Sequence, residues 1–189
     1  MMETSVSDAQ VDAGGVDRTH IVLVGMMGSG KSSVGRGVSS RMGRPLLDSD
    51  QLIEERAGRS IPEIWEVDGE RAFRALETQV LLEALNSNEP AVIATGGGVV
   101  LSETNRAALV ESDAHVVWLL ADVGQLAARV SGSTQRPLLN SSEGSSVETE
   151  LGRILDDREP LYQEVADAVV SATNRSVSDV VKAVLRCCG

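Results

Sequence analysis

A glycine-rich segment directly after the first apolar run places the strongest constraint on the fold of this chain. Residues 25–32 read Gly-Met-Met-Gly-Ser-Gly-Lys-Ser, a G-x-x-x-x-G-K-S pattern, and residues 21–24 before them read Ile-Val-Leu-Val. The stretch that follows, residues 32–42, has a helical pattern. Strand, glycine loop and helix in this order are the context that a phosphate-binding loop requires. The alternative, a flexible glycine turn, does not require these flanks, and we therefore predict a nucleoside triphosphate site.

The loop residues have separate roles in this prediction. Glycines allow backbone N–H groups to point at phosphate oxygens, and the start of the helix adds partial positive charge. We expect Lys31 to reach the β- and γ-phosphates and the Ser32 hydroxyl to ligate Mg²⁺. Of the 17 basic residues only Lys31 and Lys182 are lysines. A lysine kept in the loop indicates chemistry, because a planar guanidinium does not fit there.

Apolar runs alternate with helical patterns along the chain. The candidate strands are residues 21–24, 45–47, 91–94, 115–120 and 168–170, and the candidate helices are residues 32–42, 50–57, 69–86, 103–111, 122–130, 148–158 and 177–187. This alternation predicts an α/β fold, a three-layer α/β/α sandwich with a five-stranded parallel sheet. Ligands of such sheets bind beyond the C-terminal ends of the strands.

Composition limits the possible partners and the domain organisation. The 189 residues fit one domain over 18–189, and the polar, acidic residues 1–17 are expected to be a disordered tail. The net charge of −11 and the four aromatic residues oppose a nucleic-acid partner. No apolar run approaches the length of a membrane span, and no signal peptide is recognised. We expect a cytoplasmic monomer in which arginines gather locally around the anionic nucleotide.

A Ser/Gly-rich segment breaks the alternation. Residues 131–147 have little periodicity, and Arg136 precedes a proline within them. A connection of this length in a compact domain is often a lid, and a kinase needs one to keep water from its phosphate site. We expect a mobile lid here, in which Arg136 either forms an ordinary turn or brings a charge to the phosphates on closure.

Polar residues follow two of the predicted strands. Asp48 and Asp50 close the second strand, where one carboxylate could support Mg²⁺ and the other could accept a proton from a hydroxyl. Helix capping is the simpler role for this pair. Gly96, Gly97 and Gly98 follow the third strand and permit close backbone approach to a ligand, although a loop hinge would use the same residues.

Two arginines on predicted helices have simple structural interpretations. Arg74 stands four residues after Glu70, so a solvated ion pair explains it without function. Arg158 comes two residues before Pro160, and an arginine at the C-terminus of a helix is favourable in itself. Neither arginine identifies a site when it is taken alone.

Taken together, these segments resemble the shikimate kinase family, a P-loop family related to nucleoside monophosphate kinases. The matching segments occur in order and at suitable spacing from about residue 20 to 186; they are 25–32, 47–50, 58–65, 69–77, 95–98, 136–139 and 158–162. The resemblance implies Mg²⁺-assisted, in-line transfer of phosphate from ATP to the 3-hydroxyl of shikimate. The whole set is highly specific, whereas the phosphate loop alone is not.

The resemblance also implies a role for each matching residue. Lys31, Asp50 and Arg136 would be catalytic, and Ser32 and Asp48 would hold the metal. The residues implied for nucleotide binding are Gly28, Ser29, Gly30, Lys31, Ser32, Ser33, Arg129, Arg136 and Arg175. Those implied for shikimate binding are Asp50, Arg74, Gly96, Gly97, Gly98 and Arg158, with Trp65 and Phe73 on the apolar side of the pocket. Here Trp65 departs from the phenylalanine that is frequent in the family.

Two rival functions remain open from the residues. A small-molecule kinase for gluconate or a nucleoside monophosphate would share the phosphate loop, but it does not call for the set of Arg74, the three glycines and Arg158. A degenerate nucleotide-binding module would be expected to lose Lys31, Asp50 or Arg136, and all three are present.

Overall fold

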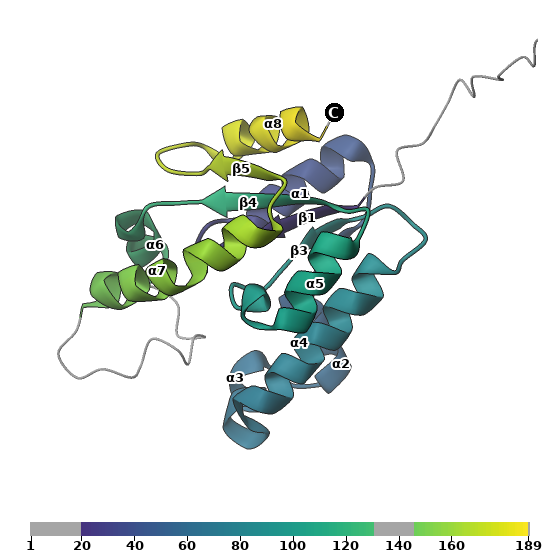
Figure 1. The fold of residues 1–189 in the computed structure, drawn as a ribbon, viewed down its shortest axis with the longest axis vertical. Helices are drawn as coiled ribbons and strands as arrows, with labels where there is room; N and C mark the ends of the chain where they lie inside the picture. Colours follow the sequence, from purple (N-terminus) through teal and green to yellow (C-terminus); the bar gives the residue numbers. More distant parts are fainter. Residues whose placement is uncertain (1–19, 131–145, 189) are drawn as a thin grey trace, which may run out of the picture.

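The computed structural model describes residues 20–130 and 146–188, and its centre is a five-stranded sheet (Figure 1). The strands are β1 (Ile21–Val24), β2 (Leu46–Asp48), β3 (Val92–Ala94), β4 (His115–Leu120) and β5 (Ala168–Ser171). All neighbouring pairs are parallel, in the order β2-β3-β1-β4-β5. This confirms the predicted parallel sheet. The strand order changes direction at β1, so β3 lies on one side of this strand and β4 on the other.

Helices cover both faces of the sheet, as the alternation predicted. They are α1 (Lys31–Met42), α2 (Ser49–Ala57), α3 (Ile61–Val67), α4 (Gly69–Leu85), α5 (Glu103–Glu111), α6 (Val123–Val130), α7 (Val147–Val165) and α8 (Val177–Cys187), with a short 3₁₀ turn η1 (Val99–Leu101). The helices α1 and α8 pack together on one face, and α5 and α7 lie on the other (Figure 1). The helices α2, α3 and α4 extend beyond the sheet. Within the described residues, no helix is long and apolar enough to span a bilayer.

Helix α7 is longer than the sequence predicted. The prediction ended it at residue 158, before Pro160, but the helix runs over Val147–Val165 with the proline inside it. Proline removes one backbone hydrogen bond, yet the buried residues on both sides of it share one helix face. Burial of Tyr162 and Val165 therefore outweighs the lost bond. Arg158 is consequently inside the helix, so its interpretation as a C-terminal residue was wrong.

Two further boundaries differ from the sequence prediction. Ser146 caps α7 and Val147 begins it, so the last two residues of the predicted lid belong to this helix; the rest of the lid lies outside the described residues. Helix α3 was not predicted at all, because its seven residues are too few for a periodic pattern. Its local signal is a capping box, in which Ser60 and Glu63 satisfy each other's backbone N–H groups.

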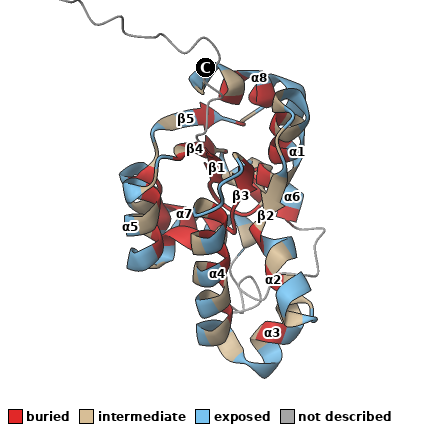
Figure 2. Cartoon of the chain, turned by 90° about the vertical axis from the view of Figure 1, so that its right-hand side faces the viewer, coloured by how far each residue is buried: buried red, intermediate tan, exposed pale blue. Residues whose placement is uncertain are grey.

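The buried apolar residues form two clusters, shown in red in Figure 2. The larger one surrounds the sheet, where β1 is buried along its whole length because helices cover both faces. The smaller one consists of Ile53, Ile64, Phe73 and Val80 and joins α2, α3 and α4. The candidate site is lined by residues of both clusters, for example Met27 of the larger and Phe73 of the smaller.

Candidate functional site

A cavity of about 390 Å³ lies beyond the C-terminal ends of β1 and β3. Its walls come from the loop before α1, from α2, α3 and α4, from the glycine triplet after β3, and from α7. The sequence-predicted site residues that line it are Gly28, Gly30, Lys31, Ser32, Ser33, Asp50, Arg74, Gly96, Gly97, Gly98 and Arg158. Trp65 and Phe73 line it too, so the structure brings together residues that are more than a hundred positions apart in the chain.

The phosphate loop has the backbone geometry that its glycines permit. Gly28 and Gly30 have φ values of 79° and 98°, which side chains with a Cβ rarely adopt. The Lys31 side chain is only 8% exposed and folds back over the loop. Its Nζ donates hydrogen bonds to the carbonyl oxygens of Gly25 and Met26, at 2.7 and 2.9 Å. Lys31 is thus held at the cavity wall, within a loop shaped for an anion.

The two carboxylates after β2 have separate positions. Asp48 is the N-cap of α2, and its Oδ1 accepts a hydrogen bond from the Asp50 N–H at 3.2 Å. The capping alternative is therefore confirmed for Asp48, which is not among the residues that line the cavity. Asp50, in the first turn of α2, does line it. Between them, Ser49 Oγ accepts a hydrogen bond from the Gly96 N–H at 2.9 Å and ties α2 to the glycine triplet.

Arg74 forms the ion pair with Glu70 that the sequence suggested, at 3.5 Å, but this pair is not its main contact. The side chain is only 19% exposed, and its Nη1 donates a shorter hydrogen bond to Oε2 of the buried Glu77 at 2.7 Å. The guanidinium carbon also lies 5.7 Å from the Trp65 ring centroid and 5.2 Å from that of Phe73, within range of cation–π attraction. A Cβ at Gly98 would stand 2.3 Å from Arg74 Nη1. The missing side chain of Gly98 is therefore what makes room for this guanidinium.

Glu77 is a site residue that sequence reasoning missed. It is 1% exposed and lines the cavity between Arg74 and the glycine triplet. Burial raises the pKa of this carboxyl above its ordinary value, and the charge on Asp50 adds to the rise, while Arg74 and Arg158 oppose it. A Cβ at Gly96 would stand 2.6 Å from Glu77 Oε1, an oxygen with no hydrogen-bond partner among the described residues.

The sequence does contain a signal for Glu77. The buried positions of α4 are 73, 77, 80, 81 and 84, so this glutamate occupies the apolar face of an amphipathic helix. A charged residue on such a face is almost never fully buried without a partner. The helical periodicity alone therefore marks Glu77 as a functional or paired residue.

The C-terminal wall of the cavity is formed by α7. Arg158 is 6% exposed, and its Nη1 donates to the carbonyl oxygen of Gly97 at 2.9 Å. The Tyr162 hydroxyl donates to the same oxygen at 2.6 Å. The Arg158 guanidinium therefore contacts the glycine triplet at the wall of the cavity.

Four predicted nucleotide-site or metal-site residues do not line this cavity. Arg129 Nη1 donates to the Gly28 carbonyl at 3.1 Å, so it contacts the outside of the phosphate loop. Arg175 donates to the carbonyl oxygens of Ser171 and Asp179, and the buried Ser29 lies within the loop. Asp48 is the fourth. Arg136 lies outside the described residues.

The arrangement brings an anion-binding loop, a lysine, a carboxylate and two arginines to the lining of one cavity. Such a cavity can hold a triphosphate at one end and a small anionic acceptor with hydroxyl groups at the other. With the parallel sheet and the loop between β1 and α1, it defines a kinase of the P-loop class.

Comparison with known proteins narrows this class. The family model described as shikimate kinase matches residues 27–188. A shikimate kinase from Marinomonas sp. (strain MWYL1) is 42% identical over 167 residues, 88% of this chain and 90% of that protein. One from Ruegeria pomeroyi is 40% identical over 187 residues, 98% of this chain and 93% of that protein.

A solved structure agrees with these relatives. The shikimate kinase from Acinetobacter baumannii, determined in complex with shikimate, superposes with a TM-score of 0.84 at 37% identity. The match covers 90% of this chain and 92% of that one. The chain belongs to the shikimate kinase family.

Proposed function

We propose that this chain transfers the γ-phosphoryl group of ATP to the 3-hydroxyl of shikimate by direct, in-line displacement. The observation that carries the proposal is one cavity whose lining contains Arg74 and Arg158 together with the phosphate loop and Lys31. Asp50 lines the same cavity. Membership of the shikimate kinase family supports the choice of acceptor.

The acceptor end of the cavity suits a carboxylated triol. A carboxylate is recognised best by guanidinium groups, and Arg74 and Arg158 supply two of them. Asp50 accepts hydrogen bonds from the ring hydroxyls and takes the proton from the attacking oxygen. The backbone at Gly97 and Gly98 contacts the ring substituents, and Trp65 and Phe73 cover the apolar side of the ring. Each of these roles is a proposal for this chain.

The nucleotide end suits a magnesium triphosphate. Mg²⁺ takes only one or two protein ligands at such sites and completes its shell with phosphate oxygens and water. The Ser32 hydroxyl lines the cavity and fits this role, and Asp48 retains its second carboxylate oxygen beside its capping bond. When bound, the ion neutralises charge on the transferred group. Among the described residues, no three His, Cys, Asp or Glu side chains are grouped so that they could hold a metal ion.

Three further arginines complete the proposed nucleotide site. Arg136 comes from the lid and meets the phosphates, and Arg129 or Arg175 flanks the adenine ring. Contact of Arg129 with the phosphate loop at Gly28 supports its part in this set. We also propose that the enzyme acts as a cytoplasmic monomer without nucleic-acid or membrane partners, as its net charge of −11 favours.

A coupled assay of ADP release tests the proposal. The purified chain is given MgATP with shikimate, gluconate, CMP or AMP, and the product is identified by ³¹P NMR. We expect turnover with shikimate and a single phosphomonoester product. Turnover with CMP or AMP in place of shikimate would establish the nucleotide-kinase alternative, and turnover with gluconate would establish the sugar-acid one.

A further inference from the structure

We propose that Tyr162 is a positioning residue for the binding of the acceptor. Its hydroxyl holds the Gly97 carbonyl in place, and that carbonyl in turn determines the positions of the glycine triplet and of the Arg158 guanidinium. The inference rests on the proposed function, because it assigns Tyr162 to the binding of shikimate. Tyr162 does not line the cavity itself and acts only through its neighbours.

Tyr162 is fixed by burial, by a ring contact and by a hydrogen bond. It is fully buried, and its ring stacks on Trp118 of β4 with centroids 5.6 Å apart and planes 21° apart. Its hydroxyl donates to the Gly97 carbonyl oxygen at 2.6 Å. Burial raises the pKa of this phenol to about 12, so it remains a donor at every pH at which the protein is studied.

The Gly97 carbonyl joins the glycine triplet to helix α7. Arg158 Nη1 donates to the same oxygen at 2.9 Å, so the hydroxyl and the guanidinium share one acceptor. Tyr162 follows Arg158 by four residues on α7, which places both side chains on the same face of the helix. A displaced carbonyl would therefore displace the guanidinium that is proposed to hold the substrate carboxylate.

The direction of this carbonyl also sets the direction of a donor. In a planar trans peptide the C=O of Gly97 and the N–H of Gly98 point in opposite directions. Within the described residues, the N–H of Gly98 forms no hydrogen bond, and Gly98 lines the cavity. Glycine does not hold its own backbone in one conformation, so the triplet needs an outside contact to keep that N–H in place. The tyrosine hydroxyl supplies this contact from a rigid, stacked ring.

The Tyr162→Phe variant tests the inference, because it keeps the stacked ring and removes only the hydroxyl. We expect KM for shikimate to rise about five- to tenfold, the effect of one misplaced hydrogen-bonding group. KM for ATP and kcat should stay within about twofold of the wild type. A merely structural tyrosine would lower the thermal midpoint and leave both KM values unchanged.

Ser39→Ala is the matched control. The Ser39 hydroxyl donates to the Arg44 carbonyl at 2.6 Å, away from the cavity, so this variant also loses one hydroxyl-to-carbonyl bond. We expect its KM for shikimate to remain that of the wild type. An equal rise in both variants would show a general loss of structure and would overturn the inference.

A second measurement needs no substitution. Tyr162 is the only tyrosine of the chain, so growth with 3-fluorotyrosine places a single ¹⁹F label at this position. Saturating shikimate should shift the resonance, and a non-hydrolysable ATP analogue alone should not. An unshifted resonance together with an unchanged KM would overturn the inference. Failure of the wild type to phosphorylate shikimate would instead overturn the proposed function, so the two failures are distinguishable.

Discussion

Replacement of Arg74 by methionine tests the acceptor end of the cavity most directly. Methionine keeps an unbranched side chain at this position, but it removes the guanidinium, whose carbon lies 5.7 Å from the Trp65 ring and 5.2 Å from the Phe73 ring. We expect Arg74→Met to raise KM for shikimate and to leave KM for ATP unchanged. The substrate carboxylate is remote from the reacting oxygen, so kcat should change little.

The size of the effect follows from the contact that is lost. A hydrogen bond between a charged donor and a carboxylate contributes about 2–3 kcal/mol. Because about 1.4 kcal/mol corresponds to a factor of ten, KM for shikimate should rise about 30- to 140-fold. The variant also leaves Glu77 without its partner at 2.7 Å. Loss of that opposing positive charge raises the pKa of Glu77 further, so the carboxyl takes up a proton and the buried charge is avoided.

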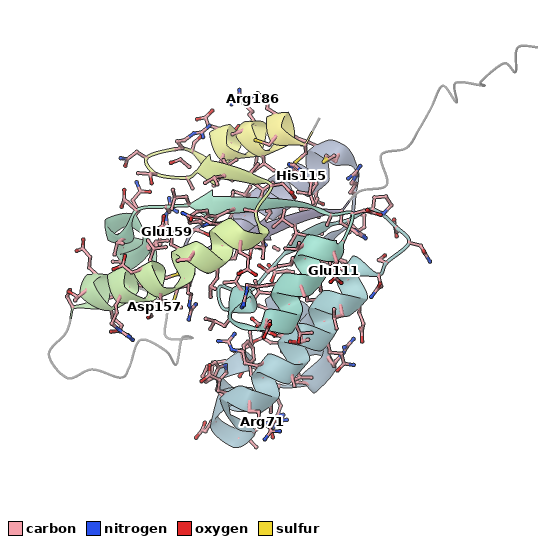
Figure 3. The ribbon with its side chains drawn as sticks, viewed as in Figure 1. Arg71, Glu111, His115, Asp157, Glu159 and Arg186 are labelled. Atoms are coloured by element: carbon pink, nitrogen blue, oxygen red, sulfur yellow. The ribbon has the colours of Figure 1, made fainter. Side chains whose placement is uncertain are left out.

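The assay is steady-state kinetics with each substrate varied at saturation of the other, together with thermal unfolding of each variant. Arg71→Met is the matched control, since Arg71 lies on the same helix with its side chain exposed at the surface (Figure 3). The control should behave as the wild type. A variant at position 74 that weakens ATP and leaves shikimate untouched would show that the acceptor pocket is misplaced, and the nucleotide-kinase alternative would gain.

Three other substitutions test the remaining roles. Lys31→Arg should abolish turnover nearly as completely as Lys31→Ala, because the loop fits an ammonium group. The control Lys182→Arg, on the exposed face of α8, should keep wild-type rates. An active arginine variant at position 31 would refute this reasoning. Asp50→Asn should lower kcat about 100-fold or more while calorimetry finds the affinity for ATP unchanged, and a loss of that affinity would assign Asp50 to the metal. Glu77→Gln should alter the pH dependence of the free energy of unfolding. Because the pKa of Glu77 is raised in the folded protein, protonation of this carboxyl stabilises the fold below its ordinary pKa of 4.5, and this stabilisation is lost as the pH rises through the higher pKa of the folded state. The thermal midpoint of Glu77→Gln relative to the wild type should therefore increase over that window, and a difference that is flat with pH would contradict the shift.

The parts of the fold that the sequence predicted are those in which local pattern and burial agree. The central strand β1 is a short apolar run that helices cover on both faces, and every residue of it is buried and apolar. The phosphate loop was predictable because its glycines stand at the positions of the motif where the backbone adopts positive φ values. Where tertiary contacts compete with local preference, prediction failed. Pro160 should end a helix, but Tyr162 and Val165 beyond it are buried in the core, and α7 continues.

The functional residues divide in a similar way. Lys31 and Asp50 were predicted from their motifs, Arg74 and Arg158 only from the resemblance to the shikimate kinase family, and the structure brings all four to one cavity. The contacts between them were not predictable, since they join segments that only the sheet order brings together. The hydroxyl of Tyr162 and the carbonyl of Gly97 are 65 residues apart in the chain. No periodicity or spacing connects two such groups, because their contact depends on how α7 packs against the sheet.

The distribution of charge explains how an acidic chain can bind two anionic substrates. Among the residues that the structure describes, the cavity lining contains three basic side chains, Lys31, Arg74 and Arg158, and three acidic ones, Asp50, Glu54 and Glu77, so the formal charges of this part of the lining cancel. Recognition must therefore come from the position of each charge and from the N–H groups of the phosphate loop and the helix that follows it. Arg71, Glu111, Asp157 and Arg186 are examples of charged side chains that are exposed on the outer surface (Figure 3). At physiological salt their field decays within about 8 Å, so the net charge of −11 does little to oppose binding inside the cavity.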